Sequence, residues 1–78
     1  MNIRENILRI LADTLGLSAA ELGPDPAMET LAAWDSVAHL NFVLSIEQEY
    51  RVQFTPEEMM ALGSASAVEA ALAAKGVR

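Results

Sequence analysis

The sequence has no cysteine, a single histidine and no long apolar run. Without cysteine it has no disulfide framework, no thiolate zinc site and no cysteine nucleophile. The one histidine, His39, excludes a metal site built from several histidines, and we expect no metal. No apolar run approaches the roughly 18 residues that span a bilayer, and the first residues lack the pattern of a signal peptide. We therefore expect a cytoplasmic protein, without membrane contact, that begins at Met1.

Basic side chains are also scarce. Five basic and eleven acidic residues give a formal net charge of −6. An acidic surface repels nucleic acid and anionic lipid, and it attracts basic patches on other proteins. The composition therefore indicates protein partners and no nucleic acid.

The chain has 78 residues, which leaves room for one domain, residues 1–78. A chain of this size buries only about 60% of the surface that its unfolded form exposes, so its core is thin. We expect a monomer without an elaborate buried active site. A hydrophobic fraction of 53% argues against disorder.

Apolar residues recur at helical spacing over residues 3–15. Asn2 with Glu5 three residues later resembles a capping box and predicts the start of this helix. Gly16 predicts a left-handed end, with Leu17 packing back on the last turn.

A long connection follows the first helix. Ser18 and Glu21 can cap a short turn that ends at residues 22–23. The sequence Pro-Asp-Pro at residues 24–26 then excludes regular helix, because proline lacks an N–H group and restricts the residue before it.

Three further helices are predicted after this connection. The second starts at Asp35 or Ser36 and runs to about Tyr50. The fourth starts at Ser66 and ends at Gly76.

The third helix is short. Thr55 is its predicted N-cap, Pro56 occupies its first position and Glu58 closes a capping box. Gly63 is expected to end it. No segment alternates with period two over a convincing length, so the predicted fold is all-α: a four-helix bundle of three main helices and this short one.

The second helix carries apolar side chains on two sides. Its expected core face consists of His39, Phe42, Val43, Ile46 and Tyr50. A second side of the helix, the one that carries Ser36, holds Val37, Leu40, Leu44 and Glu47. We call its three apolar residues, Val37, Leu40 and Leu44, the exposed stripe. An apolar stripe outside the core is a candidate surface for a partner, although isolated exposed aliphatic residues are ordinary.

The start of the second helix has its own chemistry. Asp35 is a good N-cap, accepting hydrogen bonds from the N–H of Val37 or Ala38. Ser36 then occupies the first helical position with a free hydroxyl at the positive end of the helix dipole. Unpaired N–H groups and the dipole stabilise phosphate there, so Ser36 can carry a phosphoester.

The run LAAWDSVAHL at residues 31–40 resembles the acyl carrier protein family. The resemblance continues through residues 46–50, 54–58 and 66–72 and covers nearly the whole chain. A lone Asp-Ser pair has no specificity as a motif. An Asp-Ser pair that opens the second helix, before an acidic helix end and a short capped third helix, is specific.

The resemblance implies a covalent cofactor. In that family the serine after the aspartate is esterified by 4′-phosphopantetheine, which implies attachment at Ser36, next to Asp35, by a phosphopantetheinyl transferase that uses coenzyme A. The arm ends in a thiol that holds cargo as a thioester, which accounts for a chain without cysteine. The resemblance implies a carrier and not an enzyme, delivering an acyl or aminoacyl intermediate to loading and processing enzymes.

Recognition by those enzymes is expected to follow electrostatics. Asp35 and four glutamates can border the exposed stripe and speed the encounter with basic docking sites. A solvated helix face is the alternative interpretation of the same charges. The four glutamates lie at the end of the second helix and on the third: Glu47, Glu49, Glu57 and Glu58.

Several positions depart from the residue pattern that the resemblance leads us to expect in fatty-acid carriers. Ala38, His39 and Asn41 stand where more acidic residues are common, Trp34 replaces a small residue, and Arg51 stands where glycine frequently closes the helix. These departures favour a carrier dedicated to a specialised biosynthetic pathway. We expect Trp34 to pack on the bundle.

Two alternatives remain at this point. Ser36 and His39 are neighbours on one helix, as a hydrolase would need, but His39 belongs to the core face and no oxyanion-hole element is evident. A helical protein-interaction module that is never modified shares the fold, the acidic surface and the exposed stripe.

Met59 and Met60 are expected to fill the core and its rim.

Overall fold

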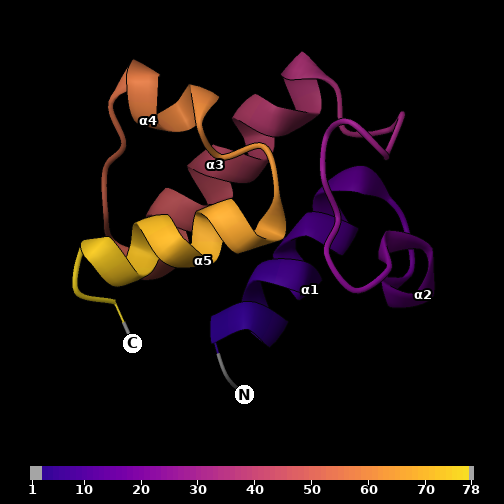
Figure 1. Ribbon diagram of the computed structural model, residues 1–78, viewed down its shortest axis with the longest axis horizontal. Helices are drawn as coiled ribbons and strands as arrows, with labels where there is room; N and C mark the ends of the chain where they lie inside the picture. Colours follow the sequence, from indigo (N-terminus) through magenta and orange to yellow (C-terminus); the bar gives the residue numbers. More distant parts are fainter. Residues whose placement is uncertain (1–2, 78) are drawn as a thin grey trace.

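The computed structural model describes residues 3–77, and over this range the chain is an all-α bundle, as predicted. Helix α1 contacts α2, α3 and α5, and the long segment between α2 and α3 runs along one side of the molecule (Figure 1). Among these residues no helix has the length and apolar character needed to cross a membrane. The helices are α1 (Ile3–Leu15), α2 (Ala19–Leu22), α3 (Ser36–Tyr50), α4 (Pro56–Met60) and α5 (Ala65–Ala74).

One hydrophobic core joins these helices. The predicted core face of α3 is confirmed at its centre, because Phe42, Val43 and Ile46 are almost completely buried. Helix α4 is different, since none of its residues is buried. The other buried apolar residues are Ile7, Ile10, Leu11, Leu22, Trp34, Phe54, Leu62, Ala65, Val68 and Leu72.

The predicted end of α1 is confirmed. Gly16 has a φ of 70°, and the Leu17 N–H donates to the Ala12 carbonyl at 3.0 Å. This 6→1 bond at a left-handed glycine is the Schellman arrangement. Leu17 is half-buried against the core, as expected. The predicted start at Asn2 lies outside the described residues.

The predicted capping boxes of α2 and α4 are confirmed, but two helix limits in the second half of the chain are wrong. Helix α4 ends at Met60 with Ala61 as its C-cap, not at Gly63. The Gly63 carbonyl instead accepts the Met28 N–H at 2.9 Å, so this residue ties the long connection to the bundle. Gly63 also lacks the positive φ that favours glycine at a helix end.

Helix α5 begins at Ala65 with Ser64 as its N-cap, two residues before the predicted start at Ser66. The Ser64 hydroxyl accepts the Ala67 N–H at 3.1 Å. Both serines are followed by apolar residues at helical spacing, so local sequence does not decide between them. The Ser66 side chain serves another purpose, because its hydroxyl donates to Asp25 Oδ1 at 2.9 Å.

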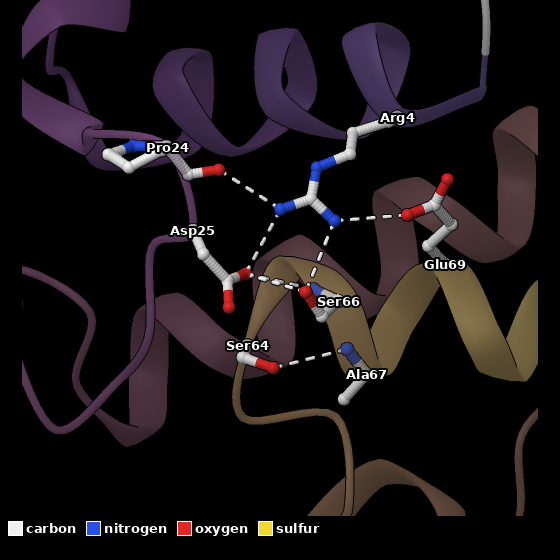
Figure 2. A network of polar contacts seen from close by, with 7 residues as sticks. All are labelled: Arg4, Pro24, Asp25, Ser64, Ser66, Ala67 and Glu69. Atoms are coloured by element: carbon white, nitrogen blue, oxygen red, sulfur yellow. Dashed lines mark hydrogen bonds and ion pairs between the residues drawn. The ribbon is translucent and has the colours of Figure 1, made fainter.

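Figure 2 shows that Arg4 connects α1, the long connection and α5. Its guanidinium donates to the Pro24 carbonyl, Asp25 Oδ1, the Ser66 hydroxyl and Glu69 Oε1 at 3.0 to 3.2 Å. Hydrogen bonds from the Ser66 hydroxyl and N–H and from Arg4 lower the pKa of Asp25 below its ordinary value of 3.8. The hydrogen bond to Glu69 raises the pKa of Arg4.

We expect this network to make the protein less stable in acid. A carboxyl group whose pKa is lower in the folded state stabilises the fold above its unfolded pKa, and this contribution is lost as the pH falls through the folded pKa. The pKa of Glu58 is lowered too, by the Thr55 N–H and Lys75. Urea unfolding at a series of pH values below about 5 should show the loss in the wild type and a smaller loss in Asp25→Asn. Equal acid dependence in both proteins would contradict this role for Asp25.

Arg51 ends α3 in an unusual backbone conformation. Its φ of 56° and ψ of 46° place it in the left-handed region, and no other residue except glycine in the described range has a positive φ. Its N–H donates to the Glu47 carbonyl. The left-handed cap expected of glycine is therefore made by arginine, at a steric cost.

Replacing Arg51 with glycine should stabilise the protein. The left-handed conformation costs a residue with a Cβ about 1–2 kcal/mol, and the greater freedom of glycine in the unfolded chain removes part of that gain. We expect the free energy of unfolding to rise by roughly 0.5–1 kcal/mol, measured by urea titration. Gln53→Gly is the matched control, because Gln53 is exposed without a positive φ, and it should destabilise. A drop in stability for Arg51→Gly would refute the interpretation.

Candidate functional site

The start of α3 is built as the sequence predicts. Asp35 is the N-cap, with extended backbone angles, and its Oδ1 accepts the Ala38 N–H at 2.9 Å. Ser36 is the first residue of the helix and is exposed. The Asp35 carboxylate is therefore committed to the helix end, and Ser36 is left with its side chain in solvent.

The Ser36 hydroxyl makes no hydrogen bond within residues 3–77. It lies where the unpaired N–H groups of a 15-residue helix and the positive end of its dipole favour an anion. A phosphate esterified to this oxygen would meet that potential without displacing any existing contact. The residues present thus fit a phosphoester at Ser36.

Trp34 lies directly before this site and packs in the core, which confirms the packing interpretation. Its side chain is 2% exposed, and its ring meets Phe42 edge-on at 5.5 Å between centroids. The backbone N–H of Trp34 also donates to the Leu31 carbonyl at 3.0 Å. The segment that leads into Asp35 is therefore held by the core.

His39 lies one turn after Ser36 and is half-buried. Its Nδ1 is 3.0 Å from Trp34 Nε1, and its Nε2 is 2.8 Å from the Met59 carbonyl oxygen. Both ring nitrogens are thus engaged, and neither contacts Ser36. Ser36 and His39 therefore do not form the hydrogen-bonded pair that a hydrolase needs.

The exposed stripe is apolar and accessible, as predicted. Val37 is 71% exposed, Leu40 51% and Leu44 43%. Met60, on α4, is 86% exposed, so the prediction that it fills the core or its rim is wrong, whereas its neighbour Met59 packs against the core. A row of exposed apolar side chains on one surface is typical of a partner site.

The structure gives two of the predicted acidic residues contacts within the fold. Glu47 is half-buried, and its Oε2 accepts the Phe54 N–H at 2.8 Å. Glu49 lies toward α1, where its Oε2 accepts from Asn6 Nδ2 at 3.0 Å. Glu49 is therefore turned away from the exposed stripe, and Glu47 contributes to the end of α3.

The two glutamates of α4 also differ from each other. Glu58 closes the capping box with Thr55 and pairs with Lys75 of α5 at 3.1 Å. Glu57 is exposed and has no hydrogen bond or ion pair within residues 3–77. Of the four glutamates predicted to border the exposed stripe, Glu57 is thus the one whose carboxylate has no partner in the described structure.

Sequence reasoning missed the contacts of two residues near this surface. The link from Trp34 through His39 to Met59 joins residues up to 25 positions apart, and no local pattern indicates it. Arg51 shares a surface groove with Leu44, Glu47, Gln48, Val52 and Gln53. Within residues 3–77 it is the one cationic side chain without an ion pair.

Comparison with known proteins agrees with this geometry. Residues 5–72 match the family described as phosphopantetheine attachment site. An acyl carrier protein of Solidesulfovibrio magneticus (strain ATCC 700980 / DSM 13731 / RS-1) is 29% identical over 58 residues, which cover 74% of each chain. No solved structure matches significantly.

The chain belongs to the phosphopantetheine attachment-site family, to which the acyl carrier proteins belong. Its cofactor is covalently attached 4′-phosphopantetheine. Its role is that of a carrier and not of an enzyme.

Proposed function

We propose that the protein holds an acyl or aminoacyl intermediate as a thioester on a 4′-phosphopantetheine arm attached to Ser36, and delivers it to partner enzymes of a specialised biosynthetic pathway in the cytoplasm. The observation that carries this proposal is the exposed Ser36 hydroxyl, which has no hydrogen bond within residues 3–77, at the first position of α3 in a chain of this family. The protein acts as a single domain and a monomer.

Each part of the site has a separate role in holding the arm. Asp35 caps the start of α3, and the N–H groups of the first turn stabilise the phosphate on Ser36. When bound, the arm supplies a thiol, whose thioesters are activated for acyl transfer. The chain itself provides attachment and presentation, and tethering raises the local concentration of cargo at each docked enzyme.

Partner enzymes are proposed to dock on the exposed stripe. Its three side chains follow Ser36 along the same helix, so an enzyme that covers them also reaches the attachment site. Asp35 and Glu57 are both exposed and provide negative charge for steering; Asp35 also caps α3, whereas the Glu57 carboxylate has no partner within residues 3–77. Glu47, Glu49 and Glu58 contribute to the field of the surface, although each of their carboxylates also has a contact within the fold. The phosphopantetheinyl transferase meets the same surface.

The departures from fatty-acid carriers support a specialised pathway. The Trp34 indole is hydrogen-bonded to His39, so these two departures form one structural unit beside the attachment site. Arg51 places an unpaired positive charge next to Leu44 of the exposed stripe. A docking surface with this positive end requires partners other than those that fit a uniformly acidic surface.

Incubation with coenzyme A and a broad-specificity phosphopantetheinyl transferase tests the proposal. The intact mass should rise by one phosphopantetheine, and peptide mapping should place it on the peptide that contains Ser36. An unmodified interaction module would keep its encoded mass. No gain of mass with excess transferase and a folded protein would refute the proposed function.

A further inference from the structure

The hydrogen bonds of His39 determine which of its nitrogens carries the proton. The indole Nε1–H of Trp34 is a donor only, so His39 Nδ1, 3.0 Å away, must accept. The neutral ring then carries its proton on Nε2 and donates it to the Met59 carbonyl oxygen at 2.8 Å. The geometry thus requires the neutral Nε2–H tautomer.

This ring joins three parts of the molecule that meet at the attachment site. Trp34 belongs to the segment before Ser36, His39 to the turn of α3 that follows it, and Met59 to α4. Helix α4 has no buried residue of its own. Met59 packs against the core, and the His39 bond and the pair between Glu58 and Lys75 tie α4 to α3 and α5.

The position of α4 matters to the surface because Met60, next to the bonded Met59 carbonyl, is 86% exposed. The carbonyl's short distance to His39 brings the end of α4 beside the first turns of α3, where the exposed stripe begins. A partner that covers the exposed stripe thus meets the Met60 side of α4 as well.

We infer that His39, in its neutral Nε2–H form, is a positioning residue: it holds Trp34 and the end of α4 against the turn that carries Ser36, and so orders the surface that the modifying and processing enzymes recognise. This inference rests on the proposed function of Ser36. His39 takes no part in proton transfer at Ser36, because both of its nitrogens are occupied.

The hydrogen bond between Trp34 and His39 requires the neutral form of the ring. A proton added to Nδ1 turns it from an acceptor into a donor that faces the Trp34 N–H, and two donors cannot share a hydrogen bond. The carboxylates nearest in sequence to the three linked residues are Asp35 at the start of α3 and Glu57 and Glu58 on α4; Glu47, Glu49 and Tyr50 lie farther along α3. Asp35 is bound to the Ala38 N–H, and Glu58 to Thr55 and Lys75. Protonation of Nδ1 therefore breaks the bond to Trp34, whereas Nε2–H still donates to the Met59 carbonyl of α4.

Two substitutions separate the halves of this link. Asn carries an oxygen near the position of Nδ1 and can still accept from Trp34, whereas Gln carries an amide near the position of Nε2 and can still donate to Met59. His39→Leu removes both bonds. We expect His39→Leu to raise the KM of a broad-specificity transferase for this protein roughly 3- to 10-fold with kcat unchanged, and each half-isostere to recover part of the loss.

Fluorescence provides a readout that does not involve the loaded carrier. Trp34 is the only tryptophan, so its emission reports the link directly. Over a series of decreasing pH values, the wild-type emission should shift when Nδ1 takes up a proton and the indole loses its partner. The three variants should show no such transition, and at neutral pH His39→Asn should resemble the wild type more closely than His39→Leu does.

Ser64→Ala is the control for simple destabilisation, because it removes the N-cap of α5 and leaves the link intact. It should lower stability without changing KM. The inference is overturned if His39→Leu keeps the wild-type KM, if Ser64→Ala raises KM as much, or if the wild-type emission has no transition that the variants lack. With excess transferase all four variants should still be modified completely, whereas a wild type that gains no mass refutes the proposed function itself.

Discussion

Ser36→Ala should abolish the gain of one phosphopantetheine completely. The phosphoester needs a hydroxyl oxygen that an enzyme can reach, and Ser36 offers one at the start of α3 that is exposed and makes no hydrogen bond to the described part of the chain. Alanine removes that oxygen and leaves the helix intact, because the N-cap is Asp35 and not Ser36. Intact mass spectrometry after reaction with coenzyme A and excess transferase measures the result.

The matched control is Ser18→Ala. Ser18 is also an exposed serine at a helix start, but its hydroxyl accepts the Glu21 N–H in the capping box of α2. This variant should lose about 1 kcal/mol of stability and still gain the full mass of the arm. Modification of Ser36→Ala to the wild-type extent would show that another residue is the attachment site.

The fold was predictable wherever one strong local signal decides the structure. Glycine with a following apolar residue ended α1 at Gly16 and Leu17, and the Asp-Ser pair began α3 at the predicted residue. The start of α5 was not decided in this way. Ser64 and Ser66 offer similar caps, and the choice between them depends on Asp25, which engages Ser66 from 41 positions away.

The candidate site shows the same division. Periodicity placed the exposed stripe and the buried face of α3 correctly, because both follow from the direction of side chains on a single helix. The surroundings of the glutamates depend instead on neighbouring elements: Asn6 engages Glu49 from α1, and Lys75 engages Glu58 from α5. Charge in the sequence thus identified acidic residues without showing which of them have contacts inside the fold.

The Trp34–His39 pair is the clearest case of structure that local sequence could not reveal. Helical periodicity put His39 on the core face, and Trp34 was expected to pack on the bundle, but each prediction concerned one residue. Their hydrogen bond depends on how Trp34 packs in the core, and the second bond, from His39 to Met59, exists only because α4 lies beside α3. Two residues that looked like independent departures from fatty-acid carriers are one arrangement.

Phe42→Ala should be the most destabilising single change in α3. Phe42 is fully buried and meets the Trp34 ring edge-on at 5.5 Å. Truncating a buried phenylalanine costs about 3–5 kcal/mol, and a domain of this size has roughly 4–12 kcal/mol in total. We expect the urea midpoint to fall sharply, with Trp34 emission shifted toward that of the unfolded chain under mild conditions.

Val37→Ala is the matched control on the same helix. Val37 is 71% exposed, so its truncation should change stability by no more than about 0.5 kcal/mol, although it removes part of the proposed docking surface. The two variants therefore separate folding from recognition. Phe42→Ala should slow modification of Ser36 in proportion to the unfolded fraction, whereas Val37→Ala should raise the transferase KM while the fold stays intact. A loss of less than about 1 kcal/mol in Phe42→Ala would be inconsistent with the cost of truncating a buried aromatic ring, and would show that Phe42 and Trp34 do not form the core that supports the attachment site.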